Sequence, residues 1–238
     1  VGGSPTPYTL PRQEVPAGLN WDKWLGPLPQ TIYYNSDLNP VITLEPEQNE
    51  QLWGAWRWYK GMGGGLMTDW GAHMFDIAQW GMGKDRNGPD KIIPAGYGPY
   101  EHLTYFYDNG TRVTEQEFDG GKQGVKIYGE NGEWIQVCRG EFLASDPKFM
   151  PETKKKESDV PYETQVGHYQ TFINSIRSRI DPNVPVEVGH SSNTMCILGN
   201  IANELGRPVV WNPIVEKFMH DPKADKLTHY QYRDGYKL

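Results

Sequence analysis

The sequence predicts an α+β fold, with an open-faced antiparallel or mixed β-sheet that carries helices on one face. Residues 91–137 show period-two apolar runs joined by Asn-Gly turns, which are typical of antiparallel hairpins. Patterns with helical periodicity precede and follow this block. Because strands and helices do not alternate along the chain, a doubly wound parallel sheet is not expected.

The first 50 residues are rich in proline and poor in periodicity. One short helical turn is expected in the stretch NWDKWLG, capped by Asn20 and ended by Gly26. Trp21 and Trp24 lie in this turn, and leaving two indoles in water would be costly. We therefore expect residues 1–50 to form an ordered arm.

A glycine run at 63–65 leads into a segment whose apolar positions favour a buried helix. Thr68 or Asp69 is expected to begin this helix, and Gly81 and Gly83 to end it. The run itself predicts a loop that approaches a ligand or makes a tight backbone contact.

The strand block contains two strong turn signals, Asp108-Asn109-Gly110 and Glu130-Asn131-Gly132. Each joins two alternating runs, so at least four antiparallel strands are expected. The charged stretch 145–160 then predicts a surface loop, and RPVVWNP near the C-terminus predicts a short strand.

Two further helices are expected in the C-terminal third. The first covers 162–180, because one of its faces is apolar and the pair Asp181-Pro182 stops it. The residues of that face are Tyr169, Phe172, Ile173, Ile176 and Ile180. The second begins at a capping Ser191 or Ser192 and ends at Gly206, and the polar tail 214–238 is expected to wrap over the body.

Composition excludes several functional classes. The chain has 30 acidic and 23 basic residues, a net charge of −7, so nucleic acid is not an expected partner. No apolar run reaches the length of a membrane span, so no membrane partner is expected. Cys138 and Cys196 are expected to be free and buried, although one disulfide stays open, and no metal-ligand spacing occurs.

Asp69 and His73 are four residues apart, so both can face one pocket from a single helix. Such a pair suits proton transfer at a hydroxyl or carbonyl group, with the carboxylate fixing the imidazole or holding a substrate hydroxyl. The alternative is that Asp69 caps the helix and His73 is an ordinary half-buried histidine. Asp76 is a further polar candidate, either as an acceptor behind the pair or as a solvent contact.

A dinucleotide site is not expected in this chain. The G-x-G-x-x-G fingerprint follows a hydrophobic strand, whereas WGAWRWYK, which precedes GMGGGLMTD, is a poor parallel strand. Leu66 stands where the last glycine of the fingerprint is required.

The segment GGGLMTDWGAHMFDIAQWGMG resembles the opening of the C-terminal domain of the Gfo/Idh/MocA oxidoreductases. LNWDKWLGP and GRPVVWNP extend the resemblance, in order, from about Pro16 to Leu238, within a bacterial branch that acts on sugars and related polyols. The resemblance implies that His73 assists proton transfer at the reacting hydroxyl and that Asp69 orients it.

Further substrate-binding residues follow from the same resemblance. Trp56, Arg57 and Trp58 precede the helix and are expected to form the pocket wall, although a packing role is the alternative. His168 is a more remote pocket candidate, and Asp76 completes the set.

The resemblance covers only the second half of such an enzyme. The N-terminal Rossmann domain and its Glu-Lys-Pro motif are absent, so residues 51–238 are expected to be one substrate-binding and oligomerisation domain. NAD or NADP would bind to the parent protein and not to this chain. A homo-oligomer through the open sheet face is expected. The abrupt start without Met predicts a fragment, so cytoplasmic and periplasmic locations both stay open.

Two alternatives to the sugar or polyol dehydrogenase remain at this point. The domain could be a stand-alone carbohydrate-binding or scaffold module without catalysis. It could also belong to a glycosidase that uses NAD through transient oxidation, as some relatives do, and that releases a free sugar with no net NADH.

Overall fold

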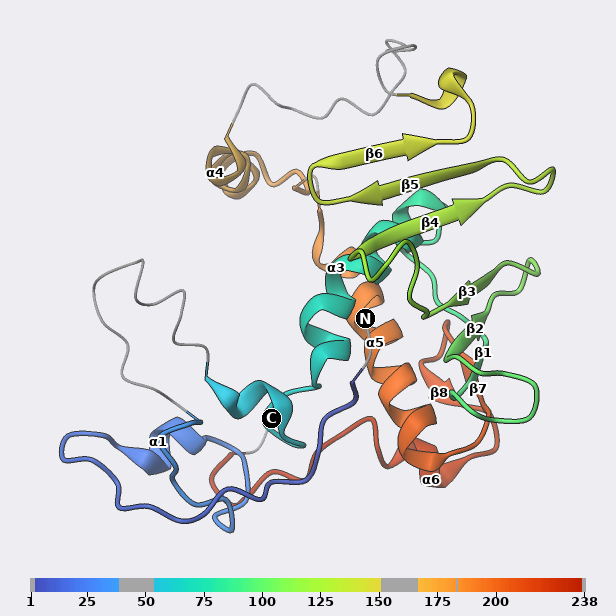
Figure 1. Cartoon of the computed structure of the whole chain (residues 1–238). Helices are drawn as coiled ribbons and strands as arrows, with labels where there is room; N and C mark the ends of the chain where they lie inside the picture. Colours follow the sequence, from blue (N-terminus) through green and yellow to red (C-terminus); the bar gives the residue numbers. More distant parts are fainter. Residues whose placement is uncertain (1–2, 39–53, 151–166, 183, 237–238) are drawn as a thin grey trace. The chain divides into compact units, whose positions relative to one another are not determined.

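A computed structural model describes residues 3–38, 54–150, 167–182 and 184–236 (Figure 1). The chain divides into two compact units. The first contains residues 1–72, 89–116 and 195–238, and the second contains 73–88 and 117–194. The domain boundary expected at residue 50 lies within the range 39–53, which is outside the described residues. This boundary therefore stays a prediction.

The first unit is built on a five-stranded antiparallel sheet with the order β3-β2-β1-β7-β8. The Asn-Gly turn at 108–110 joins β2 to β3, as the sequence predicts, and the backbone of Gly110 is left-handed with φ 84°. The strands are β1 (Lys91–Ile93), β2 (Thr104–Phe106), β3 (Arg112–Thr114), β7 (Val209–Asn212) and β8 (Lys217–Phe218).

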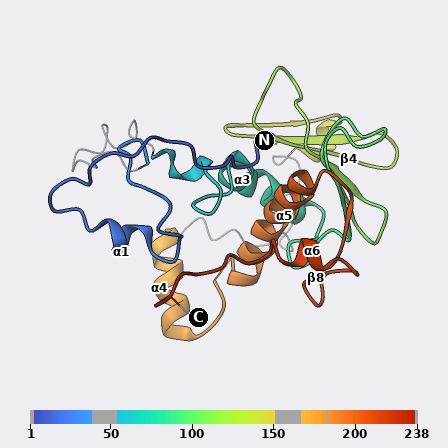
Figure 2. The ribbon, with the colours of Figure 1, turned by 90° about the horizontal axis from the view of Figure 1, so that it is seen from below.

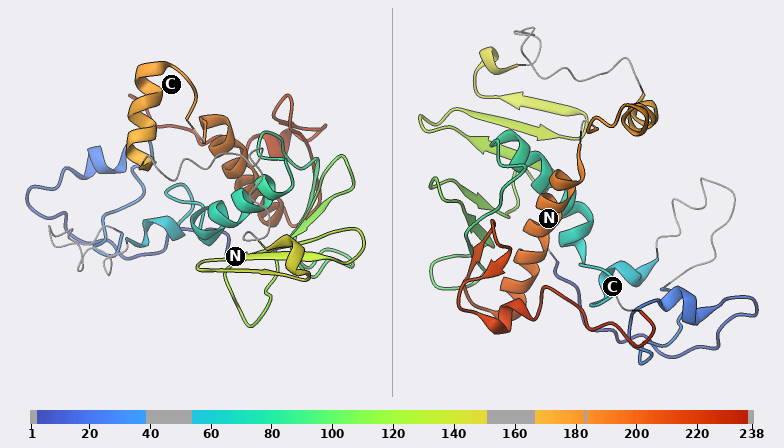
Figure 3. Two further views of the ribbon diagram at one scale, coloured as in Figure 1. Left: turned by 90° about the horizontal axis from the view of Figure 1, so that it is seen from above. Right: turned by 180° about the vertical axis from the view of Figure 1, so that it is seen from behind.

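One face of this sheet forms the core of the first unit. Ile92, Tyr105 and Val209 lie opposite one another in the register and are buried. The C-terminal part of helix α5 (Val186–Leu205) runs beside these strands, with Gly199 against the ring of Tyr105 (Figure 3). On the other face Val210 is exposed and Ile93 is buried. The α+β class is confirmed by the helices, the antiparallel sheets and the match to the family.

The second unit contains a three-stranded antiparallel sheet with the order β4-β5-β6. Its strands are β4 (Gly124–Tyr128), β5 (Trp134–Cys138) and β6 (Glu141–Ala144). The second predicted turn, 130–132, joins β4 to β5. Most side chains of the sheet are half-buried, and Tyr128 and Leu143 are exposed. Association of copies through an open sheet face stays a prediction.

Helix α3 (Leu66–Gly81) begins two or three residues before the predicted start at Thr68 or Asp69. Gly65 adopts φ 69° and its carbonyl accepts hydrogen bonds from the backbone N–H groups of Thr68 and Asp69. Gly65 therefore turns the chain into the helix, and Asp69 lies in the first helical turn and does not cap it. The predicted end at Gly81 is confirmed.

Helix α5 also begins earlier than predicted, at Val186, so Ser191 and Ser192 lie inside the helix and cap nothing. Their hydroxyl groups are used across the second unit instead. Ser192 Oγ donates to Asp76 Oδ1 at 2.6 Å, and Ser191 Oγ donates to the carbonyl of Asn87. Gly206 ends α5 as expected, with φ 61°.

Helix α4 (His168–Ser178) is shorter than the expected 162–180. Arg179 ends it in a left-handed conformation, ahead of the Asp-Pro pair, and residues 162–166 lie outside the described part. The apolar face of the helix is exposed, with 86% of Tyr169 and 62% of Phe172 accessible. The surface loop predicted at 145–160 holds a short 3₁₀ helix, η2 (Pro147–Phe149), and continues outside the described residues.

The N-terminal arm (Figure 2) carries helix α1 (Trp21–Leu25), capped by Asn20 and ended by Gly26 as predicted. Trp21 and Trp24 stack with their ring centroids 4.7 Å apart. The C-terminal tail reaches this arm, because Arg233 donates to the carbonyl of Gly26 at 2.6 Å. The tail thus does fold over another part of the chain.

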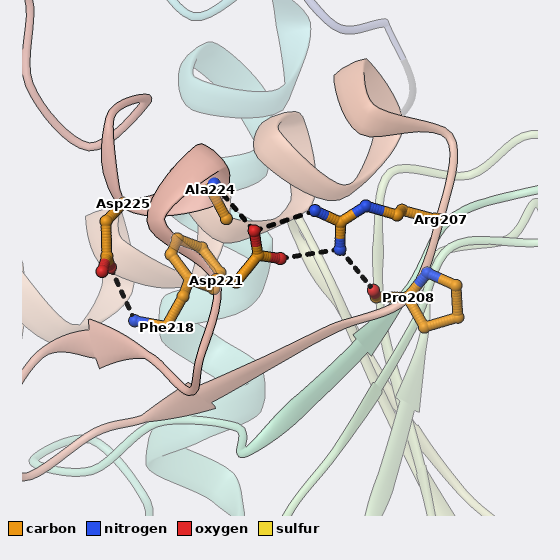
Figure 4. A network of polar contacts seen from close by, with 6 residues as sticks. All are labelled: Arg207, Pro208, Phe218, Asp221, Ala224 and Asp225. Atoms are coloured by element: carbon orange, nitrogen blue, oxygen red, sulfur yellow. Dashed lines mark hydrogen bonds and ion pairs between the residues drawn. The ribbon is translucent and has the colours of Figure 1, made fainter.

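Helix α6 (Pro222–Asp225) lies in the tail and is tied to the segment that follows α5 (Figure 4). Arg207 pairs with the carboxylate of Asp221 through both Nη atoms, at 2.7 and 2.9 Å. Asp221 Oδ1 also accepts from the backbone N–H of Ala224, and Asp225 accepts from that of Phe218 at 2.8 Å. These contacts connect α5, the β7–β8 hairpin and α6.

Candidate substrate site at the start of helix α3

An ion pair lies at the head of α3. Arg57 Nε is 3.4 Å from Asp69 Oδ1, and the two side chains are 17% and 25% exposed. Arg57 comes from the 3₁₀ helix η1 (Ala55–Trp58), and its Nη1 also donates to the carbonyl of Gly54. The pair therefore joins two of the residues that the sequence analysis selects, and it holds the Asp69 carboxylate in a half-buried position.

Two indoles flank the guanidinium of Arg57. Its Cζ lies 5.2 Å from the ring centroid of Trp56 and 5.7 Å from that of Trp58. Both indoles are more than a third exposed. Trp56, Arg57 and Trp58 therefore lie together and present apolar ring surface next to a carboxylate, and their role as a pocket wall stays a prediction.

The glycine run brings η1 and α3 together. The N–H of Gly65 donates to the carbonyl of Arg57 at 2.9 Å, which closes the loop between the two helices. A Cβ on Gly63 would lie 2.5 Å from that carbonyl oxygen, too close for any side chain. The tight backbone contact predicted for this run is thus what places Arg57 next to Asp69.

Segments distant in sequence brace the same loop. Asn200 of α5 donates from Nδ2 to the carbonyl of Gly64 at 2.8 Å. Thr6 pairs with Tyr59 in a parallel bridge directly after η1, with hydrogen bonds to the backbone of Trp58 and Lys60. The loop at the head of α3 is therefore held in place by the N-terminal segment around Thr6 and by helix α5.

His73 and Asp76 lie on α3 beyond Asp69, in the part of the helix that belongs to the second unit. His73 is exposed. Asp69 and His73 lie on one continuous helix, which the prediction from their four-residue spacing assumed. Asp76 is half-buried and accepts the hydrogen bond from Ser192 described above, so it has a protein partner within its own unit.

His168 begins α4 in the second unit and is exposed. Its ring lies 6.4 Å from that of Tyr169 in a tilted arrangement. This ring contact joins His168 to its sequence neighbour, and it does not involve the Arg57–Asp69 ion pair, Trp56 or Trp58. Its role as a pocket residue stays a prediction.

The strands that the structure describes do not form a dinucleotide site of the doubly wound type. Both sheets are antiparallel, so the strands of the described residues provide no crevice of the doubly wound type. In the same part of the chain, no group of three or more His, Cys, Asp or Glu side chains could hold a metal ion. No helix there is long and apolar enough to cross a bilayer.

The model of one family, described as the oxidoreductase family C-terminal alpha/beta domain of Gfo/Idh/MocA type, matches residues 6–238. The chain belongs to the Gfo/Idh/MocA oxidoreductase family. The match covers nearly the whole sequence and agrees with the α+β architecture. No curated protein and no solved structure matches the chain significantly.

The contacts that hold the head of α3 in place were not predictable from the sequence. Arg57 and Asp69 are twelve residues apart with a glycine turn between them, and no periodicity connects them. Asn200 gave a weak signal, since it is a polar residue within an otherwise apolar helical pattern, whereas Ser192 was expected to cap the helix. A polar group in that setting needs a hydrogen-bonding partner, which is what α3 and its loop provide.

Proposed function

We propose that this chain is the substrate-binding domain of an NAD(P)-dependent oxidoreductase that acts on a hydroxyl group of a sugar or polyol. The observation that carries the proposal is the Arg57–Asp69 pair between two half-exposed indoles, in a chain of the Gfo/Idh/MocA family. The nicotinamide would accept the hydride and would be bound by a domain outside this sequence.

The carboxylate of Asp69 is the group that orients the substrate. One of its oxygens faces Arg57, and a carboxylate has about four lone-pair sites, so others can accept a hydrogen bond from a sugar hydroxyl. Because Arg57 is fixed by Gly54 and by the loop, the carboxylate has a defined position before substrate arrives.

The indoles of Trp56 and Trp58 supply the apolar part of the site. Sugar rings have C–H faces that pack on aromatic surfaces, while their hydroxyl groups need polar partners at the ring edge. His73 lies four residues after Asp69 on α3 and is exposed, so it can take the hydroxyl proton as the alcohol is oxidised.

The natural gene product that contains this chain provides the test. It is mixed with NAD or NADP and a panel of aldoses, polyols and glycosides, and both nicotinamide absorbance and free sugar are measured. A substrate-dependent rise in NAD(P)H supports the proposal. Release of free sugar without net NAD(P)H shows the glycosidase instead. No change in either signal overturns the enzymatic proposal in favour of a binding or scaffold module.

A further inference from the structure

A cleft of about 680 Å³ lies in the N-terminal arm, and the function proposed above makes no use of it. Its volume is within the range of small-molecule sites, roughly 300–1,000 Å³. It is formed by the extended segment 12–15, helix α1 and residues 30–34. The residues of the candidate substrate site do not line this cleft; these are Trp56, Arg57, Trp58 and Asp69.

The extended wall of the cleft is anchored by its backbone and by Gln13. The N–H of Gln13 donates to the carbonyl of Tyr34 at 2.9 Å, and Gln13 Oε1 accepts from the N–H of Ser36 at 2.9 Å. The neighbouring side chains of Arg12 and Glu14 are exposed and line the cleft. No ion pair within the described ranges involves either of them.

Helix α1 forms the opposite wall. Trp21 is held by its stack on Trp24 and by an edge contact with Tyr34, whose ring centroid is 5.5 Å away. The carboxylate of Asp22 accepts a hydrogen bond from Arg233 Nη1 at 2.5 Å. The C-terminal tail thus fixes one carboxylate of the cleft in place and neutralises its charge.

The chemistry of this lining selects the ligand. Asp22 is matched by Arg233, and Arg12 and Glu14 carry opposite charges, so the lining as a whole is close to neutral. The carboxylate of Glu14 would repel an anionic ligand, and the guanidinium of Arg12 would repel a cationic ligand. The side chains combine donors, acceptors and the ring of Tyr33, which is 45% exposed with Arg12 over it at 4.9 Å.

We propose that the N-terminal cleft is a second binding site, and that its ligand is a neutral carbohydrate. A sugar presents hydroxyl groups that both donate and accept, next to apolar C–H surfaces, and this matches planar polar side chains set beside aromatic rings. The site is independent of the oxidoreductase reaction, and binding there requires no nicotinamide.

Isothermal titration of the purified chain with maltose, cellobiose and lactose, without nicotinamide, tests the proposal. At least one disaccharide should bind, and Arg12→Gln and Glu14→Gln should each weaken binding by about tenfold or more, because each removes a charge-assisted hydrogen bond. Both residues are exposed, so the variants should keep the wild-type circular dichroism. Glu130→Gln, an exposed acid in the β4–β5 turn, is the matched control and should bind as the wild type does.

His73→Asn separates this proposal from the proposed function, since it should lower the kcat/KM of the parent enzyme by about 10²–10⁴-fold and leave disaccharide binding to the N-terminal cleft unchanged. Three results would overturn the cleft proposal. The first is that none of the three disaccharides binds. The second is that binding is insensitive to both cleft variants. The third is tighter binding of glycylglycine, galacturonate or glucosamine, which would assign the cleft to a charged or zwitterionic ligand.

Discussion

At the scale of single residues, partners decide what a polar side chain does. Asp69 and Asp76 belong to the same helix, yet one pairs with Arg57 and the other accepts from Ser192. The spacing of Asp69 and His73 could be predicted, because helical periodicity is a local property. The Arg57 pairing could not, because it depends on how the glycine loop closes.

Asp221 provides a test at this scale. The hydrogen bond from Arg207 holds the pKa of Asp221 below its usual value of 3.8. A folded-state pKa below that of the unfolded chain means that the pair stabilises the fold above pH 3.8, and that this contribution disappears as the pH falls through the folded pKa.

Urea unfolding of Asp221→Asn against pH measures this effect. The variant should be less stable than the wild type at neutral pH, and the gap in unfolding free energy should shrink in acid. Asp234→Asn, an exposed carboxylate in the tail, serves as the control and should change little. A gap that is the same at neutral and strongly acidic pH would contradict the account.

At the scale of elements, the sequence predicts the strands and their turns well, because period-two alternation and Asn-Gly pairs are local signals. Helix starts were less predictable. Serine is a good cap, so Ser191 and Ser192 looked like the beginning of α5, whereas the helix starts at Val186 and uses both hydroxyl groups for tertiary hydrogen bonds.

Two glycines of α5 give a matched test of packing. A Cβ on Gly199 would clash with the hydroxyl of Tyr105 and lie 3.0 Å from Leu103 Cδ2, whereas one on Gly189 would meet open space. We expect Gly199→Ala to lower the unfolding free energy by about 1–3 kcal/mol through overpacking. Gly189→Ala should raise it by up to about 1 kcal/mol through helix propensity. Equal effects in a denaturation experiment would show that α5 does not pack on β2 in this way.

At the scale of the whole molecule, buried ionisable groups make the fold sensitive to alkali. Burial raises the pKa of the Cys196 thiol from 9.0 to about 12 and also raises the pKa of Tyr105 and Tyr107. Because these folded-state values lie above the unfolded ones, the stabilisation is complete below pH 9 and is lost as the pH rises toward 12.

Replacing Cys196 separates the contribution of its thiol to the pH dependence of stability from that of the two tyrosines. Cys196→Ala should flatten the fall in unfolding free energy between about pH 9 and about pH 12, where one thiol contributes at most about 1.4 kcal/mol per pH unit. Ile201→Val, a deletion in the buried part of the same helix, should cost about 0.5–1.5 kcal/mol at every pH and keep the wild-type slope. An unchanged slope in Cys196→Ala would show that the thiol ionises as readily folded as unfolded.

The most direct test of the central claim is the kcat/KM of His73→Asn in the parent enzyme, measured with the best substrate of the sugar and polyol panel. General acid–base catalysis predicts a loss of about 10²–10⁴-fold. His102→Asn, an exposed histidine of the first unit, is the control and should keep wild-type activity. If His73→Asn retains the wild-type kcat/KM, helix α3 does not supply the proton-transfer group and the proposed site is wrong.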